Sequence, residues 1–137
     1  MRTQVEYAVQ QNGLSNEFFF HGNVNNVEQW LCNSHIYLHT AWYEPFGLVF
    51  LEAMAAGLPC VTLNGKGNRD LFENGINGFI IEKQNAKEFA DKILELYNNP
   101  SLYKKISASG QLFAKKYDIK KVADEYIEFY HLLLKSV

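Results

Sequence analysis

The sequence is poor in cysteine and carries little net charge, and both features exclude classes of protein. Its only two cysteines, Cys32 and Cys60, stand in apolar surroundings and lack the spacing of a metal site. We interpret them as reduced thiols of a cytoplasmic protein. A formal net charge of −2 over 137 residues offers no basic footprint for nucleic acid, so no nucleic-acid partner is expected.

Long apolar runs are also missing. No stretch approaches the roughly 20 apolar residues that cross a bilayer, and residues 1–13 lack the hydrophobic segment of a signal peptide. We therefore expect no transmembrane segment and a cytoplasmic location. A peripheral position at the inner membrane face is the alternative, because the predicted helices between residues 104 and 121 are rich in lysine. Acidic residues from 124 to 128 balance those lysines and favour a solvated face instead.

What is present fits one compact α/β domain. Hydrophobic residues make up 47% of the chain and aromatic residues 15%, as in ordinary globular proteins. Apolar runs at 18–21, 35–39, 59–63 and 79–81 predict buried strands. Helices are predicted over residues 2–12, 27–31 and 46–56, and three more are predicted after the caps Asn85, Asn99 and Asp118. Asn23 and Asn25 are candidate caps of the helix through 27–31. Alternation of the two predicts a parallel sheet covered by helices.

One stretch, residues 44–59, concentrates the candidate chemistry. Pro45 keeps Glu44 out of the helical region, on the loop that enters a helix. Gly57 and Pro59 end that helix. The N–H groups of its first turn have no partner within the helix, so they form an anion site. Glu44 lies before this site and Glu52 about a turn inside it, which suits a phosphate flanked by hydroxyl-rich rings.

Glu44 and Glu52, with seven residues between them, resemble the E-x7-E motif of retaining glycosyltransferases of the GT-B type, family 4 or glycosyl transferases group 1. The runs 34–40 and 67–79 resemble the same family, and the similarity covers roughly residues 14–137. It implies a Rossmann-like parallel sheet flanked by helices, the C-terminal, donor-binding domain. It also implies a catalytic Glu44 at the donor sugar and no metal or cofactor. The implied donor-binding residues are Phe46, Gly47, Leu48, Val49, Glu52 and Gly67.

The glycine-rich loop after residue 63 matches the family only in part. Asp70 stands where the family has Glu, and Lys66 stands where it has a second glycine. A contact from this loop to the donor is an open alternative to a solvated loop. His21 and His39 follow predicted strands, and without further metal ligands we interpret them as ordinary hydrogen-bonded histidines.

The resemblance implies that residues 1–137 form one partial domain, without the acceptor domain and without the first two strands of this domain. We expect the strands at 18–21 and 35–39 either to pair directly or to leave a gap that another chain fills. The implied partners are a nucleoside diphosphate sugar, with UDP expected, a saccharide or lipid-linked acceptor, and the missing domain or a second chain. We expect the isolated chain to be inactive. The alternative function is a non-catalytic nucleotide-binding or interaction module that docks a partner chain.

Overall fold

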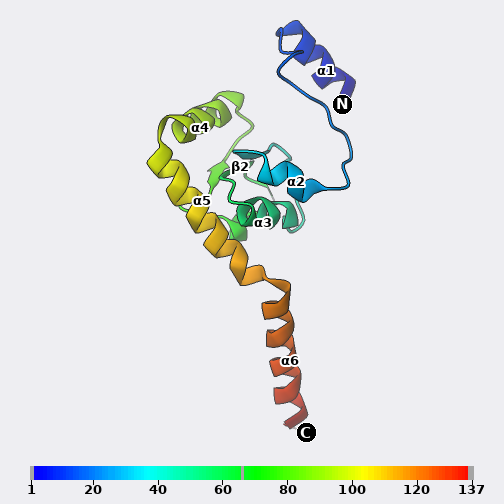
Figure 1. The fold of residues 1–137 in the computed structure, drawn as a ribbon, viewed down its shortest axis with the longest axis vertical. Coiled ribbons are helices and arrows are strands. Elements are labelled where there is room, and N and C mark those ends of the chain that lie inside the picture. Colours follow the sequence, from blue (N-terminus) through cyan, green and yellow to red (C-terminus); the bar gives the residue numbers. More distant parts are fainter. Residues whose placement is uncertain (1, 66, 136–137) are drawn as a thin grey trace.

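A computed structural model describes residues 2–65 and 67–135 (Figure 1). The strands are β1 (Tyr37–His39), β2 (Cys60–Leu63) and β3 (Phe79–Ile81), paired in parallel in that order. The α-helices are α1 (Arg2–Gln11), α2 (Val27–Cys32), α3 (Leu48–Ala55), α4 (Ala86–Asn98), α5 (Pro100–Ala114) and α6 (Ile119–Lys135). Two short 3₁₀ turns, η1 (Arg69–Leu71) and η2 (Lys115–Tyr117), complete the set. The predicted parallel α/β fold is confirmed.

Both faces of the sheet are covered, which explains why every residue of β2 is buried. Alternate side chains of a strand point to opposite faces. Cys60 accordingly joins a core cluster with α2 and α3, while Val61 and Leu63 join a second one with α4. Helix α5 supplies Ala114 to the first cluster and Ile106 to the second. The two layers hold β1 and β2 in place and so fix the loops at their carboxyl ends.

Three of the predicted helix caps are confirmed. The Oδ1 atom of Asn85 accepts hydrogen bonds from the N–H groups of Lys87 and Glu88. Asn99 accepts from Leu102 N–H with Pro100 as the first helical residue, and Asp118 caps α6 in the same way. The predicted helix α2 is confirmed, but its candidate caps Asn23 and Asn25 are wrong, because Asn26 is the residue before this helix and makes no side-chain cap.

The predicted strand at 18–21 is also wrong. These residues have no regular structure, and Phe18, Phe19 and Phe20 are 45%, 67% and 36% exposed. The rings of Phe18 and Phe20 pack on each other at 4.9 Å, and the guanidinium of Arg2 lies 5.7 Å from the Phe20 ring. Nothing in the described chain pairs with this segment, so the expected direct pairing with β1 does not occur. A strand needs a neighbour to satisfy its backbone.

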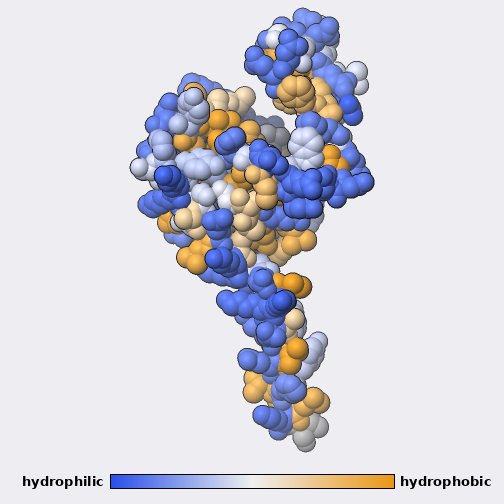
Figure 2. Space-filling model, in the orientation of Figure 1, coloured by the Kyte–Doolittle hydropathy of each residue, from blue (hydrophilic) through white to orange (hydrophobic). Residues whose placement is uncertain are grey.

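The two ends of the chain project on opposite sides from the body of the structure, which we define as residues 31–114 (Figure 1). Only Val9 is buried in α1, and α6 has no buried residue. Apolar side chains lie on the surface of α6 (Figure 2), including Tyr126, Phe129 and Leu134. The prediction of a helix here is confirmed, but its apolar side has no cover within the described chain. Among the described residues, no helix is long and apolar enough to cross a membrane.

Candidate functional site

Two loops meet at the carboxyl ends of β1 and β2, one over residues 40–47 and one that contains Asn64, Gly65, Gly67 and Asn68. At Gly67 the backbone φ is +110°, and a Cβ there would clash with the carbonyl oxygen of Glu44 and come within 2.6 Å of that of Pro45. A Cβ on Gly65 would lie 3.2 Å from the carbonyl oxygen of Trp42. The glycines therefore allow the two backbones to touch, as expected for neighbouring strand ends.

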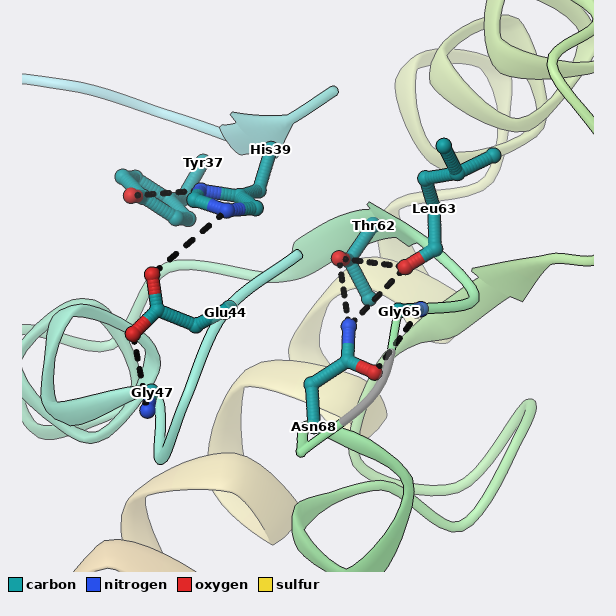
Figure 3. A network of polar contacts seen from close by, with 8 residues as sticks. All are labelled: Tyr37, His39, Glu44, Gly47, Thr62, Leu63, Gly65 and Asn68. Carbon is teal, nitrogen blue, oxygen red and sulfur yellow. Dashed lines mark hydrogen bonds and ion pairs between the residues drawn. The ribbon is translucent and has the colours of Figure 1, made fainter. Parts of the chain in front are cut away.

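Asn68 anchors the second loop from within the core (Figure 3). Its side chain is fully buried, and its Nδ2 donates to Thr62 Oγ1 at 3.1 Å and to the Leu63 carbonyl at 2.9 Å. Its Oδ1 accepts from Gly65 N–H at 3.1 Å. Sequence analysis overlooked this residue. The available signal was an asparagine in a glycine-rich turn, a position where the side-chain amide commonly bonds nearby backbone.

Glu44 lies on the loop before α3, as predicted, with 24% of its side chain exposed. Its Oε1 accepts a hydrogen bond from Gly47 N–H at 3.1 Å, and its Oε2 faces the Nε2 of His39 at 3.9 Å (Figure 3). Gly47, with φ +89°, is the N-cap residue directly before α3. The carboxylate is therefore fixed at one oxygen and turned toward β1 with the other.

The start of α3 keeps free donors. Phe50 N–H bonds to the Gly47 carbonyl at 2.9 Å, and Gly47 N–H is already bonded to Glu44. Within the described residues, the N–H groups of Leu48 and Val49 have no hydrogen-bond partner. An anion at this helix end would therefore meet Leu48 and Val49 rather than Gly47. The side chain of Phe46 is 51% exposed beside them.

Glu52 is exposed on α3 between two hollows of the surface. One, of about 460 Å³, lies against α5 and η2, and the other, of about 360 Å³, lies against α2. Their polar lining residues besides Glu52 are Glu28, Gln111, Lys115, Tyr117 and Asp118. Burial, with smaller contributions from Cys60, Glu44 and Glu52, raises the pKa of the Tyr37 phenol to about 12. Glu44 precedes α3 and Glu52 lies on its second turn, so the two motif carboxylates flank the start of one helix.

His39 connects Tyr37 to Glu44. The Tyr37 hydroxyl lies 3.3 Å from the Nδ1 of His39, and the Phe50 ring packs edge-on at 4.8 Å. The Nε2 of His39 is buried without a hydrogen-bond partner. Burial lowers the pKa of His39, and the charge of Glu44 opposes that shift. The interpretation of His39 as an ordinary hydrogen-bonded residue therefore holds for one ring nitrogen only.

The remaining candidates lie near this centre or outside it. Asp70 is exposed on η1, where Arg69 bonds to Asn64 through Nε at 2.8 Å. Lys66 lies outside the described residues. His21 packs on Trp30 of α2, with their ring centroids 4.0 Å apart. No group of three or more His, Cys, Asp or Glu among the described residues could hold a metal ion.

The fold and the site define a Rossmann-like α/β domain, with candidate ligand-binding loops at the carboxyl edge of its parallel sheet. Residues 1–113 match the family model described as "Glycosyl transferases group 1", and the chain belongs to this family. An uncharacterized glycosyltransferase of Haemophilus influenzae is 37% identical over 103 residues, which cover 74% of this chain and 29% of that protein. The poly(glycerol-phosphate) alpha-glucosyltransferase of Bacillus subtilis is 29% identical over 115 residues, 83% of this chain and 17% of that protein.

Solved structures give the same result. Anabaena Alr3699/HepE in complex with UDP-glucose matches 98% of this chain with a TM-score of 0.85 and 26% identity, over 36% of its own length. The C-terminal domain of the Francisella tularensis protein LpcC, a glycosyl transferase group 1 family protein, matches 86% of this chain with a TM-score of 0.76 and 26% identity. It is covered over 63% of its length. The chain thus spans about a third or less of the full-length relatives named here.

Proposed function

We propose that this chain is the nucleotide-sugar-binding part of a retaining glycosyltransferase that transfers a hexose from a UDP-sugar to a saccharide or lipid-linked acceptor. The observation that carries the proposal is the likeness to Anabaena Alr3699/HepE, whose structures hold UDP or UDP-glucose. Among the described residues, the free N–H groups at the start of α3 support it independently, with Glu44 before them and Glu52 on the same helix.

Different residues of the site bind different parts of the nucleotide sugar. Leu48 and Val49 N–H groups, at the positive end of α3, neutralise the diphosphate leaving group, so no metal is required. Glu52, exposed one turn further, accepts hydrogen bonds from ribose hydroxyls, as acidic residues do in dinucleotide-binding folds. Phe46 and Gly47 border the same helix start.

Glu44 acts at the sugar. Its carboxylate stabilises the positive charge that develops on the sugar ring as the bond to the diphosphate breaks. A covalent glycosyl intermediate on Glu44 and a front-face reaction both retain configuration, and both stay open. Gly67 lets the second loop close against Glu44 and Pro45, which holds the carboxylate's loop in place.

The chain covers only part of its relatives, and we propose that an acceptor domain and two further strands complete the enzyme. The outer edge of β1, which no described residue pairs with, and the exposed Phe18–Phe20 support this arrangement. Without the acceptor domain, water is not excluded from the site, so the 137-residue chain is expected to bind donor without transferring sugar.

The test is a titration of the folded chain with UDP while amide chemical shifts are recorded. Shifts are expected to map to residues 44–52. Glu52→Ala is expected to weaken UDP binding about ten- to hundred-fold, because charge-assisted hydrogen bonds contribute about 1.5–3 kcal/mol. Glu125→Ala, which removes an exposed carboxylate from α6, is the matched control and is expected to bind as the wild type does.

A folded chain that shows no binding at millimolar UDP would contradict the proposal. That result would favour the alternative, an interaction module whose role is to dock a partner chain. Binding that is equally strong in Glu52→Ala and wild type would remove the role given to Glu52.

A further inference from the structure

His39 holds an unusual atom. Its Nε2 is the single buried side-chain nitrogen or oxygen without a hydrogen-bond partner among the described residues. Buried polar groups are nearly always paired, so an orphan of this kind needs a reason. This one lies at the carboxyl end of β1 and faces the side chain proposed to act on the sugar (Figure 3).

The two ring nitrogens of His39 face different groups. Nδ1 lies 3.3 Å from the Tyr37 hydroxyl, and Nε2 lies 3.9 Å from Glu44 Oε2. A bare Nε2 lone pair opposite a carboxylate would be repelled, whereas an Nε2–H would be attracted. The neutral ring therefore carries its proton on Nε2, and Nδ1 accepts from the Tyr37 hydroxyl.

Burial keeps the His39 ring neutral, against the opposing charge of Glu44. Tyr37 on the same strand and Glu44 on the loop are the titratable groups facing His39, while α3 presents the apolar Phe50 and β2 presents the buried Thr62. Burial lowers the pKa of His39, which leaves the imidazole uncharged at pH 7. The contact with Glu44 is thus that of a neutral N–H donor and a carboxylate.

We propose that His39 is the positioning residue of Glu44: Tyr37 fixes its Nε2–H tautomer, and that N–H aims the carboxylate at the donor sugar. This inference rests on the proposed function. The present 3.9 Å separation is longer than a hydrogen bond, and a movement of about 1 Å brings the pair to ordinary length. Contacts of this kind tighten in the ligand complex.

The inference is tested first without ligand, by measuring the ¹⁵N chemical shifts of the histidine ring nitrogens in the ¹⁵N-histidine-labelled chain. His39 is expected to show protonated Nε2 and bare Nδ1. Tyr37→Phe is expected to move the ring toward a mixture of tautomers, and Glu44→Gln to shift the Nε2 resonance. A ring that is protonated on Nδ1, or that is unchanged in both variants, overturns the inference.

The second test compares UDP-glucose with UDP. His39→Leu keeps an apolar contact with Phe50 but has no donor, and is expected to weaken UDP-glucose binding about ten-fold while UDP affinity stays the same. His39→Gln carries an amide N–H and is expected to restore most of the loss. His131→Leu, on the exposed α6, is the matched control.

The results distinguish the positioning role of His39 from the proposed function in donor binding. Equal UDP-glucose affinity in His39→Leu and wild type, or equal loss in His39→Leu and His39→Gln, overturns the positioning role. A wild-type chain that binds neither ligand overturns the proposed function instead. In that case the ligand-free nitrogen spectra still decide whether His39 and Glu44 are coupled.

Discussion

The body of this protein, residues 31–114, and its two ends are built from similar patterns but differ in burial. Helix α5 carries Ile106, Gly110 and Ala114 into the core, whereas α6, with apolar residues at the same helical spacing, buries none of its residues. Outside the body, Val9 is the only buried hydrophobic residue in the described chain. An apolar stripe therefore specifies a helix and the face to be covered, while burial depends on whether the covering surface belongs to the same chain.

The same difference appears within the sheet. β2 has a neighbour on each side and is wholly buried. Within the described part of the chain, β1 is paired on one side only, and its Leu38 is 45% exposed. Unpaired strand edges attract further strands. The exposed Leu38 beside the open edge of β1 agrees with the proposal that further chain completes the fold.

The largest expected difference in stability between the body and the C-terminal helix comes from substitution of two phenylalanines. Phe50 is fully buried against Tyr37, His39 and Phe72, whereas Phe129 on α6 is 55% exposed. Phe50→Ala is expected to lower the free energy of unfolding by about 3–5 kcal/mol, because it removes a large side chain from a packed core. Urea unfolding followed by circular dichroism measures the change.

Phe129→Ala is the matched control, with an expected change below about 0.5 kcal/mol. A loss in this variant close to that of Phe50→Ala would mean that α6 is packed in solution. The contrast between the body and the C-terminal end would then be wrong.

A smaller loss of stability is expected when two glycines with positive φ are replaced by alanine. At Gly67 a Cβ would clash with the Glu44 carbonyl, while at Gly75, with φ +78°, nothing lies within 4 Å of that position. Gly67→Ala is expected to cost about 3 kcal/mol from strain and overlap together. Gly75→Ala carries the backbone strain alone and is expected to cost about 1 kcal/mol. Equal losses in the two variants by urea unfolding would show that the two loops are not in close contact.

Much of the body could be predicted from the sequence because its signals are local. β2 and β3 follow continuous apolar runs, and Asn85 and Asn99 cap their helices through their own side chains. The position of Glu44 before α3 follows from Pro45 in the same way. These features depend on neighbouring residues only.

The errors arose where a long-range partner decides the outcome. Phe18–Phe20 have the composition of a strand, but no neighbouring strand is present in the described chain to pair with them. The bond from Gly47 N–H to Glu44 depends on how the loop folds back, and the burial of Asn68 depends on packing between β2 and the following loop. The roles of Glu44, Glu52 and Gly67 in donor binding remain predictions.

The smallest expected difference in stability comes from removal of the helix caps, each of which is formed by one side chain. Asn85→Ala removes the cap of α4, which packs on the sheet through Leu96, and is expected to lower the free energy of unfolding by about 1 kcal/mol. Asp118→Ala removes the equivalent cap of α6, which has no buried residue. Because that helix adds little to the folding of the body, the urea midpoint should stay constant while amide exchange in residues 119–123 accelerates. Loss of global stability in Asp118→Ala would show instead that α6 folds as one unit with the sheet.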